Sequence, residues 1–269
     1  MLCLRSPVDP VDVCGHSKQS RQSVASLSFG DSGGRFLFLM KPYYQDESVP
    51  IYNADCRDVL PTLDTVDLVL TDPPYGIAEN SGRRLHAYKD PEKSKGRIGW
   101  SNKAEVTDYG DTRWDNDPLD IHTWALMQAL SENQVVWGAN HLVEVLGKPK
   151  QTLVWDKKCK NGWEDTFSDF EVGYSSKVAP DRMYRHLWMG AFRDGRDNNR
   201  VHPTQKPVEL MVWCAEFFPD AQTILDPFMG SGTTLRAAKD LNRKAIGIEI
   251  EERYCEIAAK RMSQMAMAF

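Results

Sequence analysis

Short apolar segments alternate with segments of helical spacing along most of the chain, beginning at residue 50. The apolar segments predict strands at residues 50–54, 66–71, 133–137, 152–155, 170–175, 223–225 and 245–248. The segments between them predict helices at residues 57–63, 119–130, 141–146, 208–218, 233–241 and 251–265. Strands separated by helices are typical of βαβ units, so the pattern predicts an α/β fold with a mostly parallel sheet.

Three segments lack this alternation. Residues 1–39 are rich in Ser, Gly, Asp and Pro without periodicity, which predicts an irregular or disordered N-terminal extension. Residues 40–269 are then the predicted folded domain, and Met40 is a hypothesis for the natural start. Within it, residues 78–118 and 176–206 are polar and basic interruptions, and loops this long in a compact domain are usually functional or disordered.

The first candidate for chemistry is the turn Asp72-Pro73-Pro74-Tyr75, which directly follows an apolar strand. Proline has no N–H, fixes its own φ and restricts the residue before it, so the turn presents acceptors only. These acceptors, the Asp72 carboxylate and the Pro73 carbonyl, suit a planar amino group, and Tyr75 adds a flat face for stacking. Taken alone, the motif is more often only a strand that ends at a proline-rich turn.

A second candidate combines two further strands that each end in an acid, Asp226 and Glu249. The first is followed by Gly-Ser-Gly-Thr-Thr, where glycines permit close backbone approach and a helix N-terminus offers N–H groups. An acid at the end of the next strand commonly holds ribose hydroxyls. Together they predict a site for a nucleoside cofactor. Neither the GxGxxG nor the P-loop pattern is present, which disfavours a nicotinamide oxidoreductase.

Two weaker signals accompany these motifs. Asp55 ends a strand and is a candidate acceptor for an adenine amino group, although alone it is more often a helix cap. The polar turn at residues 201–207, Val-His-Pro-Thr-Gln-Lys-Pro, precedes a helix and by itself predicts only a proline at a helix start.

Charge and composition narrow the classes of function. The 269 residues carry a net charge of −5, yet seven Lys and Arg against two acids lie in residues 81–103, and six against two in residues 182–206. Basic segments in a chain that is otherwise acidic either bind a polyanion or are solvent-exposed loops without such a role. Six cysteines without CxxC spacing predict reduced thiols and no metal site. No apolar run approaches the roughly 20 residues of a membrane span, and no leader is evident, which favours the cytoplasm.

Taken together, these motifs resemble the β-group amino-methyltransferases of DNA, which use S-adenosylmethionine to methylate adenine N6 or cytosine N4. The resemblance covers about residues 50–262. It rests on residues 72–75, 202–207 and 226–234, and also on 135–140 and 153–157. A catalytic motif that precedes the cofactor motif marks the β group.

The resemblance implies a Rossmann-like methyltransferase sheet with circularly permuted motif order and helices on both faces. It implies a catalytic role for Asp72, Pro73, Pro74 and Tyr75. For S-adenosylmethionine it implies that one turn surrounds the methionine part and that a second motif completes the same end. It also implies that Glu249 binds the ribose and that Asp55 and Cys56 lie near the adenine. The remaining residues of this predicted cofactor site are Asp226, Pro227, Phe228, Gly230, Ser231, Gly232, Thr233, Thr234, Thr204 and Lys206.

The predicted reaction is a direct in-line methyl transfer to the N6 amino group of a flipped-out adenine in DNA, without a covalent enzyme intermediate. Asp72 favours adenine, because N4-cytosine enzymes more often carry Ser at that position. DNA is the implied partner of this bacterial or phage-encoded protein; a homodimer and a cognate restriction endonuclease stay open. The candidate DNA contacts are Arg83, Arg84, Arg182, Arg185, Arg193, Arg196 and Arg200.

Several alternatives stay open or are disfavoured at this point. Methylation of cytosine N4, or of an amino group in RNA, is compatible with the motifs. Glutamine methyltransferases usually carry Asn-Pro-Pro-Tyr after the cofactor motif, so the motif order and Asp72 count against them. A non-enzymatic DNA-binding module predicts damaged motifs, and these are intact. The target DNA sequence and a restriction–modification role are not readable from the chain.

Overall fold

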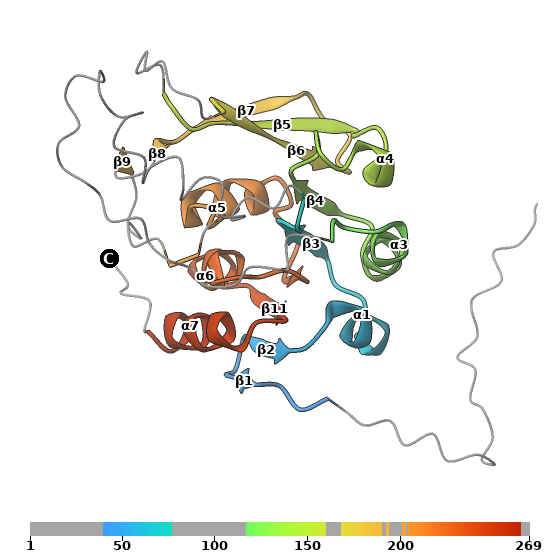
Figure 1. Ribbon diagram of the computed structural model, residues 1–269, viewed down its shortest axis with the longest axis vertical. Coiled ribbons are helices and arrows are strands. Elements are labelled where there is room, and N and C mark those ends of the chain that lie inside the picture. The colour runs from blue at the N-terminus through green and yellow to red at the C-terminus, as the bar shows by residue number, and fades with distance from the viewer. Residues whose placement is uncertain are drawn as a thin grey trace, which may run out of the picture. The chain divides into compact units, whose positions relative to one another are not determined.

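The apolar segments of the chain assemble into one mixed sheet in the computed structural model, which describes residues 40–76, 117–159, 168–189, 192–193, 201–202 and 204–264. Within these residues the sheet has nine strands in the order β1-β2-β11-β10-β3-β4-β6-β5-β7 (Figure 1). The strands are β1 (Tyr44–Gln45), β2 (Pro50–Asn53), β3 (Leu68–Thr71), β4 (Gln134–Trp137), β5 (Gln151–Asp156), β6 (Phe170–Ser175), β7 (Arg182–Arg185), β10 (Thr223–Asp226) and β11 (Lys244–Glu249). A separate ribbon pairs β8 (Trp188–Met189) with β9 (Phe192–Arg193).

The strands β2, β11, β10, β3 and β4 are neighbours and run parallel. β6 turns antiparallel between β4 and β5, and β7 pairs parallel with β5 at the far edge. β3 and β4 are buried along their whole length, which parallel strands covered on both faces require. The predicted α/β class with a mostly parallel sheet is confirmed.

Helices cover both faces of the parallel part of the sheet (Figure 1). One face carries α1 (Cys56–Val59), its 3₁₀ continuation η1 (Leu60–Thr62), α3 (Ile121–Leu130) and α4 (Val143–Leu146). The other carries α5 (Val208–Glu216), α6 (Thr233–Asp240) and α7 (Glu252–Ser263). Two separate apolar clusters result, one containing Trp124 and Met127 of α3, the other containing Leu210 and Met211 of α5.

Every predicted strand and helix is present, with its ends displaced by a few residues at most. The interruption at residues 176–206 is not without regular structure, because it contains the edge strand β7 and the β8–β9 ribbon. The sequence of β7, Arg-Met-Tyr-Arg, hides the strand, since only Tyr184 packs inward, with its ring centroid 5.2 Å from that of Trp213 on α5. The predicted extension 1–39 and nearly all of the interruption 78–118 lie outside the described residues.

The fold creates a crevice where β3 and β10 lie side by side. From β3 the chain continues to β4, whereas from β10 it continues to β11 on the opposite side. In open α/β sheets such a reversal leaves a gap beyond the carboxyl ends of the strands, where ligands bind. Asp72 follows β3 at this edge and Asp226 ends β10.

Candidate active site

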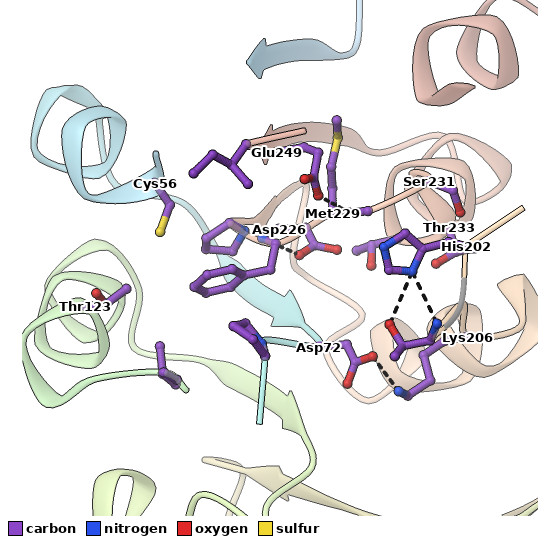
Figure 2. Close-up of a pocket in the computed structure, with 18 of the residues that line it drawn as sticks. Cys56, Asp72, Thr123, His202, Lys206, Asp226, Met229, Ser231, Thr233 and Glu249 are labelled. Atoms are coloured by element: carbon purple, nitrogen blue, oxygen red, sulfur yellow. Dashed lines mark hydrogen bonds and ion pairs between the residues drawn. The ribbon is translucent and has the colours of Figure 1, made fainter. Parts of the chain in front are cut away.

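Four acidic side chains gather at the carboxyl edge of the parallel strands. Asp55 follows β2, Asp72 follows β3, and Asp226 and Glu249 are the last residues of β10 and β11. All four line one pocket, and Figure 2 shows three of them, Asp72, Asp226 and Glu249, around a common space. Parallel register therefore brings the separately predicted motifs together.

Most of the predicted site residues line this pocket, but not all of them. The predicted residues that line it are Asp55, Cys56, Asp72, Pro74, Thr204, Lys206, Asp226, Pro227, Phe228, Gly230, Ser231, Thr233, Thr234 and Glu249. Pro73, Tyr75 and Gly232 are outside its lining. Residues that the sequence did not assign to the site also line it, among them His202, Gln205, Met211, Met229 and Thr123. His202 and Gln205 lie inside the 201–207 motif, and this motif could have indicated them as residues of the site.

Asp72 is the charged residue of the catalytic turn, and 12% of its side chain is exposed. Its Oδ1 accepts a hydrogen bond from the Tyr75 hydroxyl, and its Oδ2 contacts the Nζ of Lys206. Burial raises the pKa of Asp72, and the Lys206 ammonium opposes that rise. The charge of Glu171 adds to the rise, so the net pKa of Asp72 stays above its ordinary value, and within this balance the Lys206 cation favours the ionised form.

Lys206 is 5% exposed and lies between two carboxylates. Besides Asp72, its Nζ is 3.1 Å from Oε2 of Glu171 on β6. Burial acts to lower the pKa of Lys206, but these two anions outweigh it and raise that pKa. Glu171 also pairs with Lys157 at 2.9 Å, and the two lysines lower its pKa to about 2 against the effect of burial.

Tyr75 lies beside the pocket in an aromatic stack. Its ring centroid is 5.2 Å from that of His141 with 17° between the planes, and the Lys206 Nζ lies 5.8 Å from the centroid. The ring also packs on the backbone of Gly138. The predicted stacking of Tyr75 on a target base stays a prediction.

Asp226 is almost fully buried, and its contacts are with neutral donors. Its Oδ1 accepts from the Thr71 hydroxyl at 2.6 Å and from the Phe228 N–H at 3.1 Å. Because burial outweighs these bonds, the pKa of Asp226 rises to about 6.

Glu249 is held in the same manner. Its Oε2 accepts from the Gly230 N–H at 3.0 Å and its Oε1 from the Glu251 N–H at 2.8 Å. Burial raises the pKa of Glu249 to about 7. Among the side chains that the structure describes, neither Glu249 nor Asp226 has an ion pair, so both suit a ligand that donates hydrogens.

The turn between β10 and α6 brings backbone close to this space. Gly230 and Gly232 have φ of +49° and +80°, which L side chains rarely adopt. A β-carbon on Gly232 would lie 2.9 Å from the Cβ of Ala258, so the turn also packs directly on α7. Ser231 of this turn donates to Gln205 at 3.4 Å, which joins the turn to the 201–207 motif.

Asp55 has two roles in the geometry. It caps α1 by accepting the Arg57 N–H at 2.9 Å and pairs with the Arg57 guanidinium, which lowers the pKa of Asp55. The helix-cap interpretation is therefore correct, and the same carboxylate lines the pocket. The neighbouring Cys56 thiol is buried, which raises its pKa to about 12.

Thr204 lies beside His202, with its Oγ1 3.2 Å from the His202 Nδ1. The His202 ring meets Tyr254 of α7 edge-on at a centroid distance of 4.2 Å. These contacts fix the first half of the 201–207 motif against α7, next to the glycine turn.

Of the seven arginines predicted to contact DNA, the side chains of Arg182 and Arg185 belong to the described residues. Both are exposed on β7, and Arg185 lies 3.6 Å from Asp156. Arg83, Arg84, Arg196 and Arg200 lie outside the described residues, as does the side chain of Arg193. Within the described ranges no group of three or more His, Cys, Asp and Glu could hold a metal ion, and no helix could cross a bilayer.

The fold and the pocket define a class of protein: a Rossmann-like fold with a carboxylate-lined pocket at a strand switch point, the place where such folds bind nucleoside-bearing cofactors. Comparison with known proteins makes this specific. The family model for DNA methylases of the N6/N4 type matches residues 66–260. This chain belongs to that family of S-adenosylmethionine-dependent DNA amino-methyltransferases, and the resemblance noted in the sequence is confirmed.

Individual relatives agree with this assignment. The chain is 30% identical over 256 residues to the type II methyltransferase M.BglII of Bacillus subtilis, covering 79% of this chain and 68% of that protein. It is 27% identical over 266 residues to M.HinfI of Haemophilus influenzae, covering 84% and 72%. The crystal structure of an M1.HpyAVI–SAM complex shares the fold, with a TM-score of 0.50, 22% identity, and coverage of 80% of this chain and all of that chain.

The carboxylate acceptors of the pocket fit S-adenosylmethionine, the cofactor of this family. That molecule carries an ammonium, ribose hydroxyls, an adenine amino group and a sulfonium, all of which favour carboxylate neighbours. Asp226 and Glu249 supply such carboxylates without a competing cation among the described side chains. The glycine turn leaves backbone accessible beside them.

Proposed function

We propose that this protein transfers a methyl group from S-adenosylmethionine to the N6 amino group of adenine at specific sites in DNA, with the target base flipped out of the duplex. The observation that carries this proposal is the Asp72 carboxylate, buried and paired with Lys206 in the pocket lined by the 226–234 turn. Asp at the first position of the catalytic motif supports adenine over cytosine.

The residues of the catalytic turn each have a task in this proposal. The Asp72 carboxylate and the Pro73 carbonyl accept the two hydrogens of the amino group, which draws them from the ring plane and directs the nitrogen lone pair outward. S-adenosylmethionine, when bound, supplies a methyl group on a sulfonium. The amino nitrogen attacks the methyl carbon, the bond between that carbon and sulfur breaks, and S-adenosylhomocysteine would leave as a neutral thioether. The methylated nitrogen must then release one proton, for which Asp72 is the adjacent acceptor.

Entry of the base requires one rearrangement. Tyr75 donates its hydroxyl to the Asp72 Oδ1, which is the atom that the target amine would use. We infer that Tyr75 releases this bond when the base enters and then stacks on it. Alignment of the amine with the methyl group supplies much of the remaining rate enhancement.

The cofactor-binding assignments belong to the same proposal. Asp226 and the turn from Pro227 to Thr234 surround the methionine part, with Thr204 and Lys206 at that end. Glu249 accepts from the ribose hydroxyls, and Asp55 and Cys56 flank the adenine. All of these residues except Gly232 line one pocket, and this supports the roles. For DNA, Arg182 and Arg185 on the exposed edge strand are proposed phosphate contacts.

Sequencing of methylated DNA tests the reaction directly. The protein is expressed in a bacterial host without adenine methylation, beside a matched Asp72→Asn variant, and the DNA is read for N6-methyladenine and N4-methylcytosine. We expect N6-methyladenine in one short sequence context, absent with the variant. If N4-methylcytosine alone is found, the target base is cytosine and the proposal of adenine is wrong. If the purified protein methylates RNA and not duplex DNA, the substrate is RNA and the proposal of a DNA substrate is wrong.

A further inference from the structure

Four side chains of alternating charge form a row that leads away from the catalytic turn. Asp72 contacts Lys206, Lys206 lies 3.1 Å from Glu171, and Glu171 lies 2.9 Å from Lys157. The members come from the end of β3, the 201–207 motif, β6 and the residue after β5. Neither Glu171 nor Lys157 lines the pocket.

This row is poorly explained as a source of stability. Lys206 is 5% exposed and Asp72 12%, so both charges have lost much of their hydration. Buried ion pairs are often no more stabilising than apolar side chains of similar volume. A buried network of this kind is instead typical of a site that needs a particular charge in a particular place.

The geometry shows what the row does to Asp72. Lys206 approaches Oδ2, whereas among the described residues the contact of Oδ1 is with the hydroxyl of Tyr75. Asp72 therefore has one oxygen paired with a cation and one that accepts a hydrogen bond from a neutral hydroxyl. On its other side the Lys206 ammonium lies 3.1 Å from Oε2 of Glu171, so it has an anion on each side.

We propose that Glu171 is a positioning residue for methyl transfer: it anchors the Lys206 ammonium on Oδ2 of Asp72, so that Oδ1 faces the target amine. This inference rests on the proposed function of Asp72. Lys157 is the outermost member of the row. Its charge partly neutralises that of Glu171, so that Glu171 does not draw the Lys206 ammonium away from Asp72.

Glu171→Gln tests the role, because it keeps the shape and removes the charge. We measure the single-turnover rate of methyl transfer at saturating S-adenosylmethionine on DNA from a host lacking adenine methylation. The Kd of the cofactor and the Tm are measured in parallel. We expect the rate to fall at least tenfold, with the cofactor Kd within threefold of the parent. Glu171→Asp, which keeps the carboxylate, recovers part of the rate, which a purely structural role does not explain.

Two further variants complete the design. Glu256→Gln is the matched control, since Glu256 is exposed on α7 and pairs with Lys260, and it leaves all three measurements unchanged. Lys157→Met leaves Glu171 paired with Lys206 alone, and we expect a smaller loss of rate than in Glu171→Gln. If Glu171→Gln does not fold, the rate of Lys157→Met tests the proposal in its place. Unchanged rates in the Glu171 and Lys157 variants would overturn the proposal. Absence of methyl transfer by the parent protein would instead overturn the proposed function.

Discussion

Tyr75 packs directly against Gly138, with no room for a side chain between them. Gly138 follows β4 with φ of +76°, and a β-carbon built on it would overlap the ring atoms of Tyr75. The catalytic turn after β3 is thus shaped by a glycine of the neighbouring strand end. His141 covers the same ring by stacking at 5.2 Å.

Gly138→Ala should therefore displace Tyr75. We expect methyl transfer to slow by at least tenfold and the unfolding free energy to fall by about 1 kcal/mol or more, because alanine is also strained at this φ. Gly147→Ala is a matched control, since Gly147 has φ of +67° but nothing within 4 Å of its β-carbon position. Equal losses of activity in the two variants would show that strain, and not the position of Tyr75, is responsible.

Asp72→Asn keeps the size of the side chain and removes the charged acceptor. We expect methyl transfer to fall by about 100-fold or more, in line with the loss of one strong polar contact to a reacting group. Cofactor affinity should change by only a few-fold, because Asp226 and Glu249 remain. Calorimetric titration with S-adenosylmethionine and a methyl-incorporation assay separate the two effects. Turnover near that of the parent would refute the role of Asp72.

The parallel core of the fold was predictable because its signals are local. β3 and β4 are apolar at every position, and the glycine turn after Asp226 has a recognisable composition. Asp55, the 72–75 motif, Asp226 and Glu249 could each be assigned to the end of a strand, and parallel register then required them to meet.

The remaining parts of the site depend on contacts that no local pattern carries. Glu171 reaches Lys206 only because β6 lies next to β4 in an antiparallel position, which alternation of strands and helices does not predict. β7 was missed because its alternation of Arg with Met and Tyr resembles a basic loop. The packing of Tyr75 on Gly138 likewise arises from the order of strands in space.

Tyr75 variants separate stacking from hydrogen bonding. Tyr75→Ala removes both the ring and the hydroxyl that contacts Asp72, and we expect a loss of at least tenfold in kcat/KM for DNA. Tyr75→Trp should be milder, because a flat face remains. The measurement is steady-state methylation over a range of DNA concentrations. A larger defect for Trp than for Ala would contradict stacking as the main role.

Arg182 on the exposed edge of β7 is suited to test the proposed DNA contacts. Arg182→Gln should weaken DNA binding by a few-fold at low salt and reduce the slope of log K against log salt by about 1, because one phosphate contact is lost. Arg185 is a less direct test, since it already lies 3.6 Å from Asp156. Binding is measured by fluorescence anisotropy at several salt concentrations. An unchanged slope would exclude Arg182 from the interface.

The pKa values of Asp226 and Glu249 predict how stability without cofactor depends on pH. Burial raises the pKa of Asp226 from 3.8 to about 6 and that of Glu249 from 4.5 to about 7, so between those limits the folded protein binds more protons than the unfolded chain. The stabilisation from these groups is present below about pH 4 and is lost as the pH rises through 6 and 7. Denaturant unfolding of the cofactor-free protein should show stability falling over this range. Glu249→Gln should flatten the upper part of that fall, whereas a parallel decline in both proteins would assign the pH dependence to other groups.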